Sequence, residues 1–137
     1  MNLSKRSYYL LSFSWGLIIT LTGCLISLAL LIAGYKPQRN KYGWSFILNL
    51  NNCGFSMGPA AFVCKNPSKH MLEHEFGHSI QNCYFGPLFI FLVALPSMIR
   101  FWYREYLVKS GKKTYSQLPP YDAAWFEGGA SELGSRY

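Results

Sequence analysis

The chain has 137 residues, enough for one domain and too few for two ordinary ones. Half of its residues are apolar and 18% are aromatic, whereas only 14% are charged, against about 25% in a typical soluble domain. This composition excludes a disordered tail and a solvated repeat protein. The net charge of +7 at pH 7 favours an anionic partner. Because the apolar residues form long uncharged runs, we expect that partner to be lipid rather than nucleic acid.

The first uncharged run covers residues 7–35 and indicates a membrane anchor. Its centre, residues 10–34, consists mainly of Leu, Ile, Phe and Ala. As a helix rising ~1.5 Å per residue, it exceeds the ~30 Å hydrocarbon core of a bilayer. A cleaved signal peptide is the alternative, but its apolar region is shorter, about 7–15 residues. We therefore expect an integral membrane protein, with residues 1–35 as a transmembrane anchor and residues 36–137 as a membrane-associated domain.

The stretch after the polar connector predicts a β-hairpin over residues 44–64. Its first half is rich in aromatic and branched residues with partial alternation, and residues 51–54 form a turn signal. Residues 55–64 are a second extended stretch. Because a proline cannot donate to a strand ladder, this second strand should be an edge strand or be broken near Gly58-Pro59.

A helix is predicted from Pro67 to about Tyr84. Asn66 is a favoured N-cap, proline is favoured in the first turn, and Gly86-Pro87 should end the helix.

The uncharged segment 83–99 is expected to be re-entrant or kinked. Only residues 88–95 lie between its two prolines, too few to span a bilayer. We expect the chain to fold back at Pro96, because a complete crossing would separate the residues on its two sides. Residues 100–108 then predict a basic, aromatic helix at a membrane surface, and residues 121–133 a last short helix.

The helix after the hairpin contains the pattern His-Glu-x-x-His at residues 74–78. On a helix, His74 and His78 project from one face, close enough to bind one zinc ion through imidazole nitrogens. Glu75 can reach a zinc-bound water as general base. The alternative is two histidines satisfied by hydrogen bonds, but a capped helix is the context that the motif requires. A third ligand at His70 would stretch the set over about 12 Å, too far for one metal.

Two histidines leave a catalytic zinc one protein ligand short. The acidic residues further along the chain are Glu105, Asp122, Glu127 and Glu132. Glu127 is favoured because it lies in an apolar, small-residue segment, where a carboxylate needs a cation partner. Glu105 lies among basic residues and is explained by a solvated ion pair. Asp122 is suited to a neighbouring role, such as orienting a histidine.

These residues resemble those of the gluzincin type of zinc metallopeptidase, in which a glutamate on a later helix is the third ligand. The resemblance implies that His74, His78 and Glu127 bind zinc and that Glu75 is the base and acid. It also implies a strand before the active-site helix whose edge aligns an extended substrate. The hairpin at 44–64 fits that place.

The predicted fold class is an α+β membrane protein. It comprises an N-terminal transmembrane helix, a β-hairpin, the HExxH helix, a re-entrant or kinked apolar segment and a C-terminal ligand helix. The expected function is hydrolysis of peptide bonds in membrane-proximal protein segments by a zinc-activated water. Tyr115 and Tyr121 are candidates for stabilising the oxyanion. The alternatives are a non-catalytic membrane protein with a four-ligand structural zinc, a site-2-like intramembrane protease, and hydrolysis of a non-peptide amide.

Overall fold

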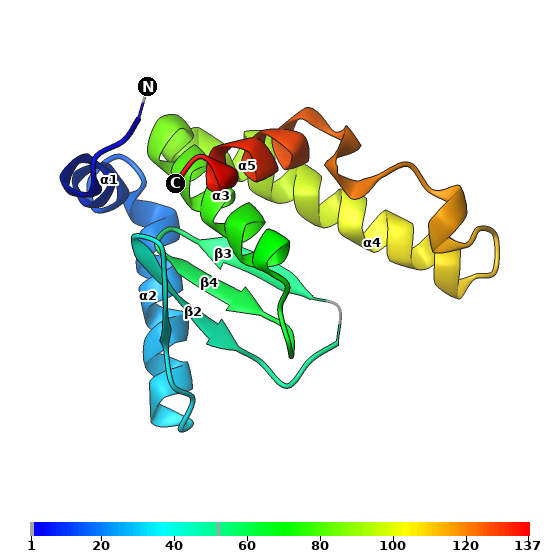
Figure 1. Cartoon of the computed structure of the whole chain (residues 1–137), viewed down its shortest axis with the longest axis horizontal. Helices are drawn as coiled ribbons and strands as arrows, with labels where there is room; N and C mark the ends of the chain where they lie inside the picture. The colour runs from blue at the N-terminus through cyan, green and yellow to red at the C-terminus, as the bar shows by residue number, and fades with distance from the viewer. Residues whose placement is uncertain (1, 52) are drawn as a thin grey trace.

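The computed structural model describes residues 2–51 and 53–137, and the mixed α+β class is confirmed. The elements of the first half are α1 (Lys5–Ser12), α2 (Leu17–Ile32), β1 (Gln38–Asn40), β2 (Gly43–Ile47), β3 (Gly54–Met57) and β4 (Ala60–Val63). The second half contains α3 (Lys69–Phe85), α4 (Leu95–Lys109) and α5 (Trp125–Ser135), with single-turn segments at Gly86–Leu88, Ile90–Ala94, Tyr115–Gln117 and Tyr121–Ala123. In Figure 1, α2 and α3 lie against the sheet, α5 lies beside α3, and α4 extends away from the sheet.

The apolar N-terminal run forms two helices, so the predicted continuous helix over residues 10–34 is wrong. The axes of α1 and α2 differ by 92°. At the corner, Gly16 packs against Asn82 of α3, and a Cβ atom on this glycine would lie 2.5 Å from Asn82 Nδ2. Asn82 Nδ2 also donates to the Gly16 carbonyl at 3.4 Å. A tertiary contact therefore accompanies the bend, and hydropathy alone does not reveal it.

Within residues 2–51 and 53–137, no single helix has the length and apolarity of a membrane span. Two helix pairs meet those criteria only jointly, α1 with α2 and α3 with α4, across bends of 92° and 119°.

The sheet has the strand order β1-β2-β4-β3, which corrects the predicted hairpin over residues 44–64. β2 pairs in parallel with β4, placing Phe46 opposite Phe62, and β4 forms an antiparallel hairpin with β3. The expected break at Gly58-Pro59 is confirmed, since the chain turns there and Gly58 has a φ of 60°. β4 occupies an interior position between β2 and β3, in agreement with the burial of all its residues. β3 lies at the edge of the sheet.

Helix α3 begins two residues later than the sequence predicts. Its N-cap is Ser68, whose hydroxyl accepts the Met71 backbone N–H at 3.0 Å. Asn66 instead has a φ of 51° and belongs to the preceding turn. The helix ends at Phe85, followed by Gly86 with a φ of 54°.

The apolar segment after α3 is bent, as expected, but the bend is not at Pro96. The chain changes direction by 119° between residue 88 and residue 90. Pro96 lies beyond that bend, within the continuous helical stretch Ile90–Lys109. The predicted place of the fold-back is therefore wrong.

Helices α3 and α5 are in direct backbone contact. A Cβ atom on Gly77 would lie 1.8 Å from the carbonyl oxygen of Ala130, and one on Gly134 would lie 1.7 Å from that of Glu73. Since a real side chain cannot occupy such space, these two glycines allow the helices to approach. The other flank of α3 packs against Tyr8 of α1, whose side chain is fully buried.

Gly77→Ala is expected to lower the free energy of unfolding by about 3 kcal/mol or more, because a methyl group there overpacks against a rigid backbone carbonyl. Thermal unfolding measures the effect. Gly129→Ala is the control, since its Cβ would approach only the flexible end of Gln81, at 3.3 Å. Equal midpoints for the two variants would contradict the close packing of α3 on α5.

Candidate metal centre

The two motif histidines and Glu127 meet in a buried cluster between α3 and α5. Glu127 Oε2 lies 3.0 Å from His74 Nε2 and 3.2 Å from His78 Nε2. Each of the three residues offers a ligand atom within 4.8 Å of the others. Tetrahedral ligands about 2.0–2.1 Å from a zinc ion are about 3.3 Å apart, so this spacing suits a single ion. The group can therefore hold a metal ion.

Ser131 and Asp122 orient the first histidine. His74 Nδ1 lies 2.8 Å from Ser131 Oγ, which itself donates to Asp122 Oδ2 at 2.8 Å. Because the serine hydrogen is used on Asp122, its oxygen accepts from His74 Nδ1–H. The lone pair of His74 Nε2 is then left for a metal.

Gln81 orients the second histidine in the same way. Its Oε1 accepts from His78 Nδ1 at 2.8 Å, while its Nε2 donates to the carbonyl of Phe126 at 2.8 Å. The second bond fixes which end of the amide faces the ring. Both histidines thus present Nε2 to Glu127, as ligands held by outer hydrogen bonds do.

The carboxyl group of Glu127 is kept ionised by its surroundings. Its side chain is fully buried, and Ser97 of α4 donates to Oε1. Burial by itself raises the pKa of Glu127, but in the metal-free protein, where His74 and His78 can carry a proton on Nε2, their hydrogen bonds and that of Ser97 outweigh it and hold this pKa well below its ordinary value. An ionised carboxylate beside two imidazole nitrogens is a suitable donor set for zinc.

Glu75 lies beside the cluster without belonging to it. It is 5% exposed, and its Oε2 has no hydrogen-bond partner among the described residues. Burial raises the pKa of Glu75, and the two neighbouring imidazoles oppose that rise. A Cβ atom on Gly54 would lie 2.9 Å from Glu75 Oε1, so the backbone of β3 passes close to this carboxyl group. Glu75 therefore lies beside the cluster with one buried oxygen uncommitted.

A cleft of about 620 Å³ opens over His74, Glu75 and His78. The edge strand β3 forms one wall, and the start of α4, with the turn before it, forms the opposite wall. The apolar lining includes Phe55, Met57, Val93, Met98, Phe101 and Trp102. An extended chain lying in this cleft would run between a strand edge and an apolar helix face, directly above the carboxyl group of Glu75.

No family model matches this chain, and no curated protein or solved structure matches it.

The other acidic candidates lie outside the cluster. Glu105 accepts from the Tyr115 hydroxyl at 2.6 Å and lies 3.8 Å from Lys109 Nζ. Glu132 is paired with Arg136 on the exposed side of α5. Among the residues in the two described ranges, no other His, Cys, Asp or Glu joins the three-residue group.

His70 and Asp122 form an outer pair. His70 is exposed, and its Nε2 lies 3.4 Å from Asp122 Oδ2. Asp122 also lies 3.8 Å from His74 Nδ1, in addition to its bond with Ser131. The neighbouring role expected for Asp122 is thus realised mainly through a serine that the sequence reasoning did not name. Ser131 is four residues after Glu127, and this i, i+4 spacing was the available signal.

Of the two candidate tyrosines, Tyr121 is closer to the cluster. Its ring centroid lies 6.2 Å from that of His74, and burial, together with the Glu127 carboxylate, raises the pKa of Tyr121 to about 12. The phenol is protonated at neutral pH, and its hydroxyl is directed toward Ser97 and Glu127. Tyr115 also lines the cleft, but its hydroxyl is committed to Glu105.

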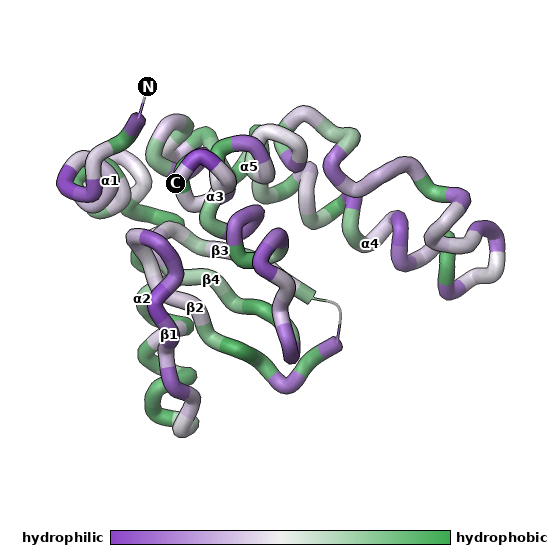
Figure 2. The backbone as a smooth tube through the Cα atoms, viewed as in Figure 1, coloured by the Kyte–Doolittle hydropathy of each residue, from purple (hydrophilic) through white to green (hydrophobic). Residues whose placement is uncertain are grey.

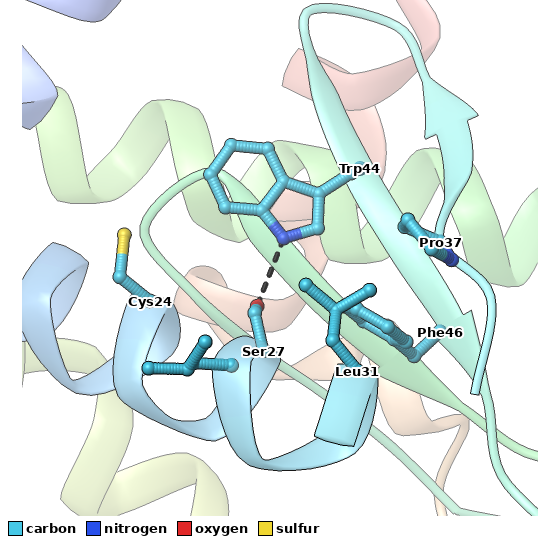
Figure 3. A pocket seen from close by; sticks show the side chains of 7 residues that line it. Cys24, Ser27, Leu31, Pro37, Trp44 and Phe46 are labelled. Atoms are coloured by element: carbon cyan, nitrogen blue, oxygen red, sulfur yellow. Dashed lines mark hydrogen bonds between the residues drawn. The ribbon is translucent and has the colours of Figure 1, made fainter. Parts of the chain in front are cut away.

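A second pocket, of about 500 Å³, lies between α2 and the start of the sheet (Figure 3). Trp44 Nε1 donates to Ser27 Oγ at 2.9 Å in this pocket. The rest of its lining is mainly apolar and includes no His, Asp or Glu. Among the described residues, Cys24 is its one titratable lining residue, so the cleft above the cluster is the candidate active site.

Ser131→Ala is expected to weaken zinc binding by roughly 10–100-fold, because it removes the oxygen that orients His74. Competition with a coloured chelator measures the affinity. Ser135→Ala is the control, since Ser135 only donates to the carbonyl of Glu132 on the exposed side of α5. Identical affinities for both variants would show that the Ser131 hydroxyl does not orient a ligand.

Proposed function

We propose that this chain is a zinc-dependent metallopeptidase of the gluzincin type. The observation that carries the proposal is the buried group of His74, His78 and Glu127 beneath a cleft that is also lined by Glu75, whose buried Oε2 has no hydrogen-bond partner among the described residues. Three protein ligands leave one position open on a tetrahedral metal, whereas a structural zinc has four protein ligands. The three-residue group therefore favours catalysis over a structural role.

Each residue of the site has a role in peptide hydrolysis. Zinc, when bound, supplies a Lewis acid for the scissile carbonyl and lowers the pKa of the attacking water. Glu75 takes the proton of that water and returns it to the leaving amine. Tyr121 donates its hydroxyl to the developing oxyanion. The free edge of β3 pairs with the main chain of an extended substrate, as in β-strand addition.

Metal analysis and peptide cleavage test the proposal on the same preparation. The purified full chain should contain one zinc per chain and cleave members of a mixed peptide library detected by mass spectrometry. A zinc chelator should stop cleavage, and added zinc should restore it. One bound zinc without cleavage of any peptide would overturn the peptidase assignment, and no bound zinc would overturn the metal assignment.

We further infer that this is an integral membrane protein and that its substrates are membrane-proximal protein segments. Figure 2 shows a continuous apolar course along α2. Its outer face carries exposed leucines and isoleucines, among them Leu25, with 68% of its surface exposed, and Ile32, with 81%. The turn before α4 adds Phe91, and α4 itself adds Ile99 and Trp102. Apolar surface on this scale favours contact with lipid.

The membrane assignment predicts that the protein resists alkaline carbonate. Exposed apolar side chains on α2 should keep the chain in the membrane pellet, and detergent should release it. Immunodetection of pellet and supernatant measures the distribution. A chain found entirely in the carbonate supernatant would contradict the assignment while leaving the metal site untouched.

A further inference from the structure

Two arginines of α4, one turn apart, hold the loop that leads into α5. Arg100 Nη2 donates to the carbonyl of Pro120 at 3.0 Å and to that of Tyr121 at 3.2 Å. Arg104 Nη1 donates to the carbonyl of Pro119 at 2.6 Å. Three successive carbonyl groups of the loop are therefore bound by one face of α4.

The same arginines lie over the side chain of Tyr121. The guanidinium carbons of Arg100 and Arg104 are 5.8 and 5.4 Å from the centroid of the tyrosine ring. Both distances are in the range of cation–π attraction. Since that ring lies 6.2 Å from the ring of His74, the arginines connect α4 to the metal centre through a single side chain.

The loop needs external anchors because of its composition. Pro119 and Pro120 have no backbone N–H, so this part of the loop cannot donate the hydrogen bonds that usually fix a turn. It can only accept them, and Nη2 of Arg100 donates to two neighbouring carbonyls.

We propose that Arg100 and Arg104 are positioning residues that hold Tyr121 above the metal centre, where it serves hydrolysis. The inference rests on the proposed peptidase function, and it assigns to α4 a role beyond that of a cleft wall. The arginines act on the reaction through Tyr121 and do not contact the metal ligands themselves.

A double-mutant cycle tests this dependence. Removing both arginines with Arg100→Gln and Arg104→Gln is expected to lower kcat by about tenfold or more, with KM within about twofold, because an oxyanion donor is worth up to ~10²–10³ in kcat. In a Tyr121→Phe background the same two changes should lower kcat by less than about twofold. An equal loss in both backgrounds would overturn the proposal.

Hydrogen exchange gives a second readout that does not require activity. Exchange in residues 114–124 should become faster in the double arginine variant, while exchange in α3 and the zinc content remain unchanged. Replacing both arginines by lysine should keep only part of the protection that the wild-type chain shows in these residues. Arg136→Gln, which removes an exposed ion pair on α5, is the matched control and should leave exchange in 114–124 unchanged.

The two readouts separate failure of this inference from failure of the peptidase assignment. If the wild-type chain cleaves no peptide, the peptidase function is wrong, and the exchange of residues 114–124 still decides whether the arginines hold the loop. Unchanged exchange in these residues, or equal acceleration in α3, would overturn the positioning role.

Discussion

Glu75→Gln is expected to abolish hydrolysis while leaving zinc bound. The amide has nearly the shape of the carboxyl group but cannot accept a proton, and a general base contributes about 10²–10⁴-fold to the rate. Glu75 lies outside the three-residue metal group, and its Oε2 has no partner that the substitution would strand. Cleavage rate and zinc stoichiometry measured on one preparation check both halves of the prediction.

Glu73→Gln is the matched control for Glu75, because it changes an acid on the same helix that faces away from the cleft. Glu73 makes only loose ion pairs with Lys41 and Lys69, at 3.7 and 3.6 Å. Such pairs are worth at most about 1 kcal/mol, so activity should remain within about twofold. Activity retained in Glu75→Gln, or zinc lost from it, would refute the role of general base.

Glu127→Gln is expected to remove both zinc and hydrolysis. The substitution takes away the ionised ligand and leaves a neutral amide between His74 and His78, whose Nε2 atoms are 3.0 and 3.2 Å from the present carboxylate oxygen. The loss of affinity should exceed the roughly 10–100-fold effect expected for an outer residue such as Ser131. Chelator competition and peptide cleavage measure the two effects.

Glu132→Gln is the control on the same helix, five residues after Glu127. Glu132 is exposed and paired with Arg136, so zinc affinity and activity should be nearly those of the wild type. A wild-type zinc affinity in the Glu127→Gln variant would refute Glu127 as the third ligand. Asp122, which lies 3.8 Å from His74 Nδ1, would then be the next candidate.

The residues of the candidate metal group are predictable because their signals are local. His74 and His78 are one helical turn apart, so any helix over this segment places them on one face. Glu127 stands out because an acid in an apolar, small-residue segment needs a cation. Gly77 and Gly134 allow α3 and α5 to approach closely, because they lie where the two helices face each other.

The sequence predictions that the structure corrects most concern the path of the chain. The apolar run 10–34 bends between residues 12 and 17, where Gly16 packs against Asn82, a residue far away in sequence. The segment 44–64 forms a mixed sheet because β4 is buried throughout and takes β2 and β3 as its two neighbours. Neither partner can be found by hydrophobic periodicity within the segment.

The sequence by itself determined the α+β class, the helix carrying the histidines, the bend in the apolar segment and the acid that lies beside both histidines in the candidate metal group. Only the tertiary structure decided which atoms surround that group: Ser131 and Gln81 behind the histidines, Ser97 on Glu127, and the arginines of α4 around Tyr121. The physical reason is the distance along the chain over which each kind of signal acts. Spacing along one helix fixes neighbours within a turn, whereas contacts between elements depend on packing that involves the whole chain.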